Sequence, residues 1–277
     1  MISDDHNPGM PPDLHGDSFS EVEHRIEVTR RRLPGYPLDH VRLARLITHI
    51  QKLQTELCNE VLKPFELNFV TYTALMMMYG SEDQTSTPSE LSSATGEKRT
   101  GTAMISDDHN PGMPPDLHGD SFNEVEHRIE VTRRRLPGYP LDHARLARLI
   151  THIQKLQTEL CNAALKPFAL NFVTSTALMM MYGSEDQTST PSELSSATGE
   201  KPTNVTRICD ELLHKGLIER YPSTSDRRRV VLRLTAQGEH LVEQYQPKIW
   251  EAMDQLYSKL SKAELQQVTS LLRRTLA

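Results

Sequence analysis

Nearly the same hundred residues occur twice in this chain, so one local sequence must fold acceptably in two different settings. The stretch that begins at Met1-Ile2-Ser3 begins again at Met104-Ile105-Ser106, with an offset of 103 residues that holds to Thr203. We call residues 1–100 copy one and residues 104–277 copy two. The copies differ only at the pairs Ser20/Asn123, Val41/Ala144, Glu60/Ala163, Val61/Ala164, Glu66/Ala169, Tyr72/Ser175 and Arg99/Pro202.

This duplication is not a repeat architecture, because solenoids have periods of roughly 20–50 residues and need several units to close a core. Copy one stops where copy two continues, and the second unit restarts on a methionine after Gly101-Thr102-Ala103. A fusion of two reading frames, natural or engineered, is therefore favoured over an old natural duplication. Three of the exchanges introduce Ala in one short region, which deliberate substitution would also produce: Ala163, Ala164 and Ala169.

Composition excludes several classes of protein. No run of 18 apolar residues and no apolar signal core is present, so we expect a cytoplasmic protein with no membrane contact. The three cysteines lack CxxC spacing, which favours half-buried thiols over a disulfide framework and leaves a redox-sensing thiol as the alternative. The twelve histidines have no ligand spacing and no catalytic motif occurs, so we expect no metal, no cofactor and no enzyme activity.

Charge is distributed unevenly along the chain. Residues 201–277 hold 13 Lys and Arg against 9 Asp and Glu, whereas residues 1–200 hold 18 against 28. Most of the excess positive charge lies between Lys201 and Arg233. A protein with a net charge of −6 can therefore still present one basic face to a polyanion.

Apolar periodicity and capping signals divide copy two into mainly helical segments with a small β-hairpin wing. Thr190-Pro191-Ser192-Glu193 is a capping box with proline at the first helical position, and Gly199 and Gly216 are predicted left-handed helix ends. The predicted helices are 123–135, a long helix that ends near 166–167, 172–182, 191–198, 202–215, 241–260 and one after the Ser261-Glu264 cap. The predicted strands are 217–220 and 230–234.

These segments give a domain plan. We expect a disordered tail at 1–37, a truncated duplicate of the N-terminal helices at 38–100, and a linker with the second tail at 101–137. The complete domain is 138–277, with dimerisation helices at 138–170 and 239–277 around a winged helix-turn-helix at 171–238. Copy one would then remain disordered or place residues 38–62 against the C-terminal helices, in the position of a partner subunit.

The order of two short helices and a basic hairpin is typical of a winged helix-turn-helix. The second helix of such a pair enters the major groove, because its N-terminal side chains then reach the base edges. Long cations at a hairpin tip can enter a narrow minor groove, and an acidic turn residue, here Asp226, can orient one of them. The alternative for both is a solvated polar face. The candidate DNA-binding residues are Thr203, Asn204, Thr206, Arg207, Arg227, Arg228 and Arg229.

Residues 138–277 resemble the MarR family of transcriptional regulators, and within it the multidrug-efflux repressor type. The resemblance is carried by Thr203–Leu212, by Lys215–Arg220 and by Ser225–Gly238, which matches the wing pattern DxRxxxLxLTxxG. It implies a homodimer on double-stranded, pseudo-palindromic operator DNA, and repression relieved by a small aromatic, often phenolic, effector. It also implies that Asp210 and Asp226 stabilise the wing together with Arg228.

Two departures from the family pattern bear on function. Pro202 stands where copy one keeps the Arg99 that such proteins carry at the start of the recognition helix, so phosphate contact should be weaker. Ser175 replaces Tyr72 near the family's ligand cavity, and Ser175, Met179 and His152 are the candidate effector-binding residues. The other interpretation is therefore a ligand-binding or dimerising protein of this family with impaired DNA binding.

Overall fold

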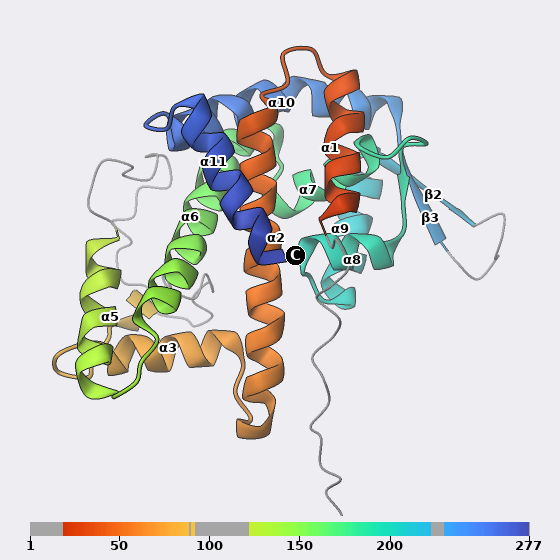
Figure 1. The fold of residues 1–277 in the computed structure, drawn as a ribbon. Coiled ribbons are helices and arrows are strands. Elements are labelled where there is room, and N and C mark those ends of the chain that lie inside the picture. Colours follow the sequence, from red (N-terminus) through yellow and green to blue (C-terminus); the bar gives the residue numbers. More distant parts are fainter. Residues whose placement is uncertain (1–18, 89, 92–121, 223–229, 277) are drawn as a thin grey trace, which may run out of the picture.

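The computed structural model describes residues 19–88, 90–91, 122–222 and 230–276 (Figure 1). Copy one contributes α1 (Ser20–Arg32), α2 (Leu38–Leu62), η1 (Lys63–Phe65) and α3 (Phe69–Tyr79). Copy two contributes α5 (Asn123–Arg135), α6 (Leu141–Leu165), η2 (Lys166–Phe168), α7 (Phe172–Tyr182), β1 (Thr188–Ser189), α8 (Pro191–Thr198), α9 (Pro202–His214), β2 (Ile218–Pro222), β3 (Val230–Leu234), α10 (Ala236–Tyr257), α11 (Lys262–Arg273) and η3 (Arg274–Leu276). Within these residues no helix is both long and apolar enough to cross a membrane.

Most helix boundaries follow the caps predicted from the sequence. The Thr190 side chain accepts from the Glu193 amide, Pro191 opens α8, and Gly199 ends it in the left-handed region with φ +72°. Ser261 and Glu264 form the second capping box. The helix predicted at 241–260 was wrong at both ends: α10 begins at Ala236, because the Thr235 hydroxyl caps it by accepting from the Gly238 amide at 3.0 Å, and it ends at Tyr257.

The wing is an antiparallel hairpin with one additional short strand. In the order β1-β3-β2, Ile218 pairs with Leu234 and Pro222 with Val230, while Thr188 of β1 pairs with Arg233. The hairpin projects away from the helices (Figure 1). Both predicted strands are confirmed, and β1 anchors the hairpin to the segment between α7 and α8.

The core of copy two surrounds α7. Every residue of this helix from Thr174 to Tyr182 is buried, which confirms the prediction of a central helix that is apolar nearly all round. Helix α10 packs along α6 and α7. Its Tyr257 hydroxyl accepts from the Gln157 side chain at 2.5 Å, and its Tyr245 hydroxyl donates to the Ser175 carbonyl at 3.3 Å.

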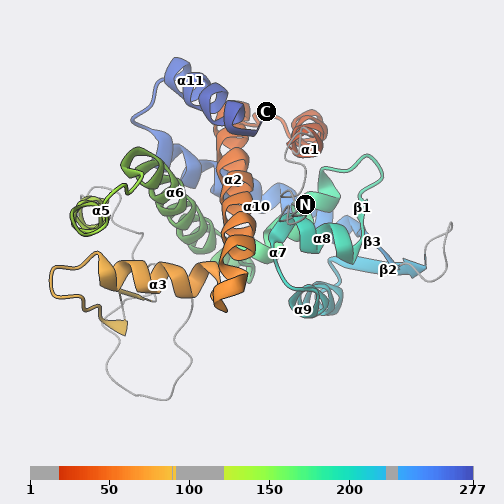
Figure 2. The same cartoon turned by 60° about the horizontal axis from the view of Figure 1, so that its bottom comes forward.

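The two copies exchange their first helices. Helix α1 of copy one lies against α7 of copy two, and α5 of copy two lies against α3 of copy one (Figures 1 and 2). The Arg32 guanidinium donates to the Ser184 carbonyl at 2.9 Å, and its counterpart Arg135 donates to the Ser81 carbonyl at 2.7 Å. Each copy therefore stabilises the other through identical residues.

Copy one also covers the C-terminal helices. Helix α2 packs against α11, α6 and α10, which agrees with the predicted placement of residues 38–62 against these helices. His40 lies 2.7 Å from Asp254 of α10, and the Tyr36 ring meets Trp250 edge-on.

The predicted tail at 1–37 is wrong for residues 19–37, because α1 forms there and buries its apolar side in the shared core. The linker and tail predicted at 101–137 is likewise wrong for residues 123–135, where the helix also predicted from the sequence forms as α5.

Candidate nucleic-acid interface

The candidate reading element is the pair α8 and α9, joined by a tight turn at Gly199. Helix α9 buries Val205, Ile208 and Leu212 against the core and directs its other side outward. Pro202 occupies the first helical turn, where its missing amide hydrogen removes no intrahelical bond. The hydrophobic contacts therefore fix the helix and leave its N-terminal polar residues available to a ligand.

Those polar residues lie where the sequence predicted them, with one difference. Thr203, Thr206 and Arg207 are exposed, whereas Asn204 is half-buried and its amide donates to the Glu200 carboxylate. The Arg207 Nε donates to the Asn204 Oδ1 at 3.0 Å. Glu200, Asn204 and Arg207 thus form a chain of hydrogen bonds that orients the arginine before any contact with DNA.

The base of the wing carries two cations, Arg220 next to α9 and Arg233 on β3. Asp210 on α9 pairs with Arg220 of β2, with 3.3 Å between carboxylate and guanidinium. The Arg233 guanidinium lies over the Tyr221 ring at 5.2 Å from its centre. Asp226 and the three arginines Arg227, Arg228 and Arg229 lie outside the described residues, so the implied Asp210–Arg228 pair is untested. Within the described part of the chain, the ion-pair partner of Asp210 is Arg220.

A cavity of about 220 Å³ lies between the first two helices of copy one and helices α7 and α8 of copy two. The cavity is lined by cationic side chains, by apolar side chains and by two carboxylates. The charged and imidazole residues are Arg25, Arg45, His49, Lys52, Glu21 and Glu193, and the remaining lining residues are Val22, Ile26, Thr29, Tyr36, Thr48, Thr176, Met179, Met180, Ser196 and Ala197.

Of the three predicted effector residues, Met179 lines this cavity and the other two do not. The Ser175 hydroxyl donates to the Phe172 carbonyl at 3.0 Å inside the core. The His152 ring packs against Phe122 at 5.5 Å, and burial lowers its pKa. The cavity is lined by α2 of copy one together with α7 of copy two, so the copy-one counterpart His49 lines it in place of His152.

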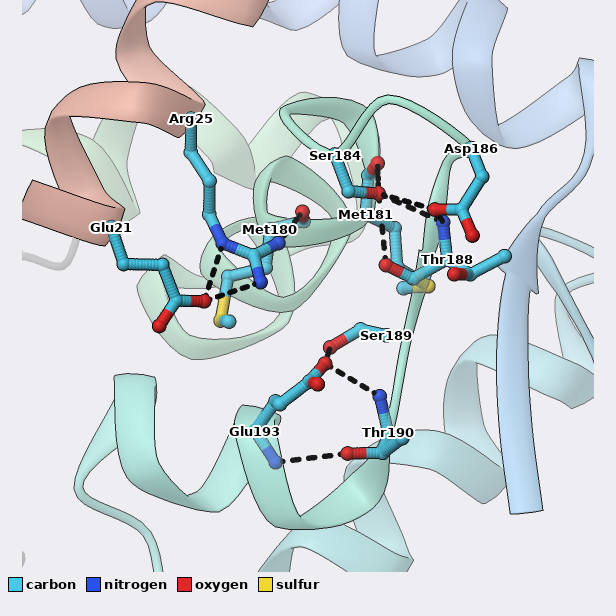
Figure 3. A network of polar contacts seen from close by, with 10 residues as sticks. All are labelled: Glu21, Arg25, Met180, Met181, Ser184, Asp186, Thr188, Ser189, Thr190 and Glu193. Carbon is cyan, nitrogen blue, oxygen red and sulfur yellow. Dashed lines mark hydrogen bonds and ion pairs between the residues drawn. The ribbon is translucent and has the colours of Figure 1, made fainter. Parts of the chain in front are cut away.

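One arginine joins α1 to α7 in the cavity wall (Figure 3). Arg25 of α1 donates to the Met180 carbonyl at 2.7 Å and pairs with Glu21 at 2.8 Å. On the opposite wall Glu193 accepts from the Ser189 hydroxyl at 2.8 Å and closes the cap of α8. A molecule in the cavity would therefore contact both α1 and the helix that precedes α9.

The cysteines behave as ordinary core thiols. Cys161 and Cys209 are buried and Cys58 is half-buried, and all three are unpaired with one another. Burial raises the pKa of each thiol, that of Cys161 to about 12. Such thiols carry little thiolate near neutral pH, which disfavours the redox-sensing alternative.

Comparison with known proteins gives a consistent set of relatives. The family model described as MarR family matches residues 176–230. The chain is 35% identical to the transcriptional repressor MprA of Escherichia coli (strain K12) over 157 residues, which cover 57% of this chain and 89% of MprA. It is 34% identical to the uncharacterized HTH-type transcriptional regulator YhbI of Bacillus subtilis (strain 168) over 120 residues, or 43% of this chain and 76% of that protein.

Solved structures match as well. Wild-type MarR from Escherichia coli in its apo form is 27% identical with a TM-score of 0.44, over 48% of this chain and 97% of that one. A MarR mutant from the same organism complexed with operator DNA is 26% identical with a TM-score of 0.44, over 57% of this chain and all of that one. The sequence relatives agree with the resemblance inferred from the wing and recognition-helix motifs.

Proposed function

Because this chain belongs to the MarR family, we propose that it is a sequence-specific, DNA-binding transcriptional repressor and not an enzyme. The observation that carries the proposal is the polar N-terminal face of α9, held outward by the buried Val205, Ile208 and Leu212. The MprA relative is named as a transcriptional repressor, which supports the same conclusion.

In this proposal α9 enters the major groove and the hairpin approaches the neighbouring minor groove. Thr203, Thr206 and Arg207 would contact bases and phosphates, with Arg207 oriented by Asn204. Arg220 and Arg233 at the hairpin base would add phosphate contacts, and Arg227–Arg229 would extend them at the tip. The target is a half-site of a pseudo-palindromic operator, and the protein acts in the cytoplasm, associated with the nucleoid when bound.

We further propose that the cavity between α1, α2, α7 and α8 takes a small aromatic effector with an acidic or phenolic group. Its cations, Arg25, Arg45 and Lys52, suit an anionic group, and its methionines suit an aromatic ring. The exchange of Tyr72 for Ser175 supports this site. In copy one, Tyr72 lies close enough to Arg148 to influence its pKa, and the counterpart of Arg148 is the cavity residue Arg45. By the same correspondence Ser175, which lies behind the cavity wall, presents a smaller side chain than tyrosine on the side of Arg45.

A specific observation favours a second candidate, a family member with reduced affinity for DNA. Pro202 is exposed at the first turn of α9, where copy one carries Arg99 in its sequence. The loss of that cation removes one phosphate contact but keeps the fold. This candidate predicts measurable binding at low salt that is lost at physiological salt.

A titration of the full chain on DNA from its own promoter region tests the proposal. We expect binding by the parent protein, at least about tenfold weaker binding by Arg207→Ala, and release by a phenolic probe such as salicylate. Lys248→Ala is the matched control, because Lys248 is an exposed cation on α10 whose ion-pair partner among the described residues is the neighbouring Glu251. Equal affinity of the Arg207 variant, the control and the parent would refute the assignment of α9.

The resemblance also implies a homodimer held by the first and last helices. Two alternatives follow for this chain, a homodimer of that kind and a single chain that supplies the equivalent contacts itself. The helices assigned to dimerisation include α6, α10 and α11, and α2 of the same chain packs against all three.

A further inference from the structure

We propose that copy one is a built-in partner subunit, which replaces the second protomer of a two-fold assembly within one polypeptide. Each chain is then complete as a monomer and carries one DNA-recognition helix, α9. The proposal rests on intrachain contacts alone and is independent of DNA binding. Four observations carry it.

The first observation is that the contacts between the copies are reciprocal. Arg25 donates to the Met180 carbonyl at 2.7 Å, and the counterpart Arg128 donates to the Met77 carbonyl at 2.9 Å. At the crossing of the long helices, the Thr48 hydroxyl donates to Gln154 at 2.8 Å, and the Thr151 hydroxyl donates to Gln51 at 2.8 Å. Identical residues therefore make the same bond in both directions, as they do across a two-fold axis.

The second observation is close backbone packing at both exchanged helices. A methyl group added at Gly183 would lie 3.0 Å from the Arg25 carbonyl oxygen, and one added at Gly80 would lie 2.7 Å from the Arg128 carbonyl oxygen. Glycine is thus needed at the same position of each copy to let the other copy's first helix approach. Such fit at both ends indicates a specific interface and not incidental contact.

The third observation concerns what copy one covers and what it leaves open. Leu46 of α2, the helix that packs against α11, is 0% exposed, whereas its counterpart Leu149 of α6 is 39% exposed. At the other end, Phe65 is 71% exposed, although its counterpart Phe168 packs against the core. Both differences have one cause, since copy one has no counterpart of residues 204–277 to cover its own α3 and the start of α6.

Ion pairs also connect copy one to the C-terminal helices that it covers. Glu23 of α1 pairs with Arg273 of α11 and lies 3.5 Å from Arg42 of α2. The His40 contact with Asp254 lies on the same side. These contacts join copy one to both C-terminal helices, which are the surface a separate protomer would need in order to dimerise.

Hydrogen exchange of the full chain tests the exchanged helices, because peptides that contain Tyr72 or Ser175 report on α3 and α7 separately by mass. Arg32→Ala removes bonds from α1 to the end of α7, and Arg135→Ala removes the equivalent bonds from α5 to α3. We expect Arg32→Ala to accelerate exchange at 172–187 at least about tenfold and leave 69–84 unchanged, and Arg135→Ala to do the reverse.

The opposite pattern, in which Arg135→Ala affects 172–187, would show that each copy holds its own first helix and would overturn the proposal. If the arginine variants fail to fold, Arg25→Gln and Arg128→Gln provide the same crossed comparison with the loss of fewer bonds. Light scattering over a dilution series completes the test. We expect the monomer mass of 31.5 kDa, and a dimer at the concentrations used for exchange would overturn the one-chain assembly.

Discussion

Two leucines at equivalent positions provide a quantitative test of the structure. Leu178 of α7 is 0% exposed, whereas its counterpart Leu75 of α3 is 51% exposed, although both lie in nearly the same sequence. Leu178→Ala removes a fully buried side chain and leaves a cavity, which costs about 3 kcal/mol of unfolding free energy. Leu75→Ala removes a side chain that is already half in water and leaves no cavity, so about 1 kcal/mol or less is expected.

Thermal unfolding followed by circular dichroism measures the difference. For a chain of this size each kcal/mol lowers Tm by about 2–4 °C, so Leu178→Ala should melt about 4–8 °C below Leu75→Ala. The two variants remove the same atoms from helices of nearly the same propensity, so local effects cancel. Equal decreases in Tm would mean that α3 is covered as well as α7 is, and the asymmetry between the copies would then be refuted.

Four further predictions concern function and ionisation. Pro202→Arg should steepen the salt dependence of DNA binding by about 0.9 in log–log slope and tighten binding about fivefold at 0.15 M salt, whereas Pro202→Gln should do neither; equal slopes in fluorescence-anisotropy titrations would contradict this. Ser175→Tyr should weaken binding of a phenolic effector at least about tenfold by calorimetry, while the control Tyr72→Ser leaves it unchanged. Burial lowers the pKa of His152 below 6.5, so the unfolded chain takes up the proton first as pH falls; from pH 7.5 to 5.5 the parent should lose more stability than His152→Gln, as denaturant titrations would show. Alkylation at pH 8, followed by mass spectrometry, should modify the half-buried Cys58 before Cys161, and the reverse order would contradict the burial of these thiols.

Short-range sequence signals were sufficient to predict most helix ends in and around the winged helix-turn-helix. Thr190 and Glu193, Gly199, and Ser261 with Glu264 each fix a helix end through a bond within four residues, so their effect is visible without tertiary context. Apolar spacing placed α7 and α9 correctly for the same reason. The cap at Asn171, whose side chain accepts from the Thr174 amide, carried a similar signal that could have been used.

The arrangement between the copies could not be read in this way. Arg25 and Arg32 lie in a polar helix whose sequence is also present at 123–135, and nothing local states which copy's carbonyls they bind. The choice depends on which surfaces α10 and α11 leave available, a property of the whole fold. The prediction of His152 as an effector-binding residue was wrong for the same reason, because its copy-one counterpart His49 lines the cavity.

The exchange of first helices has a consequence for how the assembly depends on protein concentration. A partner carried on the same chain is present at an effective concentration on the order of millimolar, so dilution does not separate it. Cleavage between the copies would leave two fragments that still hold each other's helices, but their association would then obey mass action. The covalent connection thus makes the reading helix as stable at a few molecules per cell as at high expression.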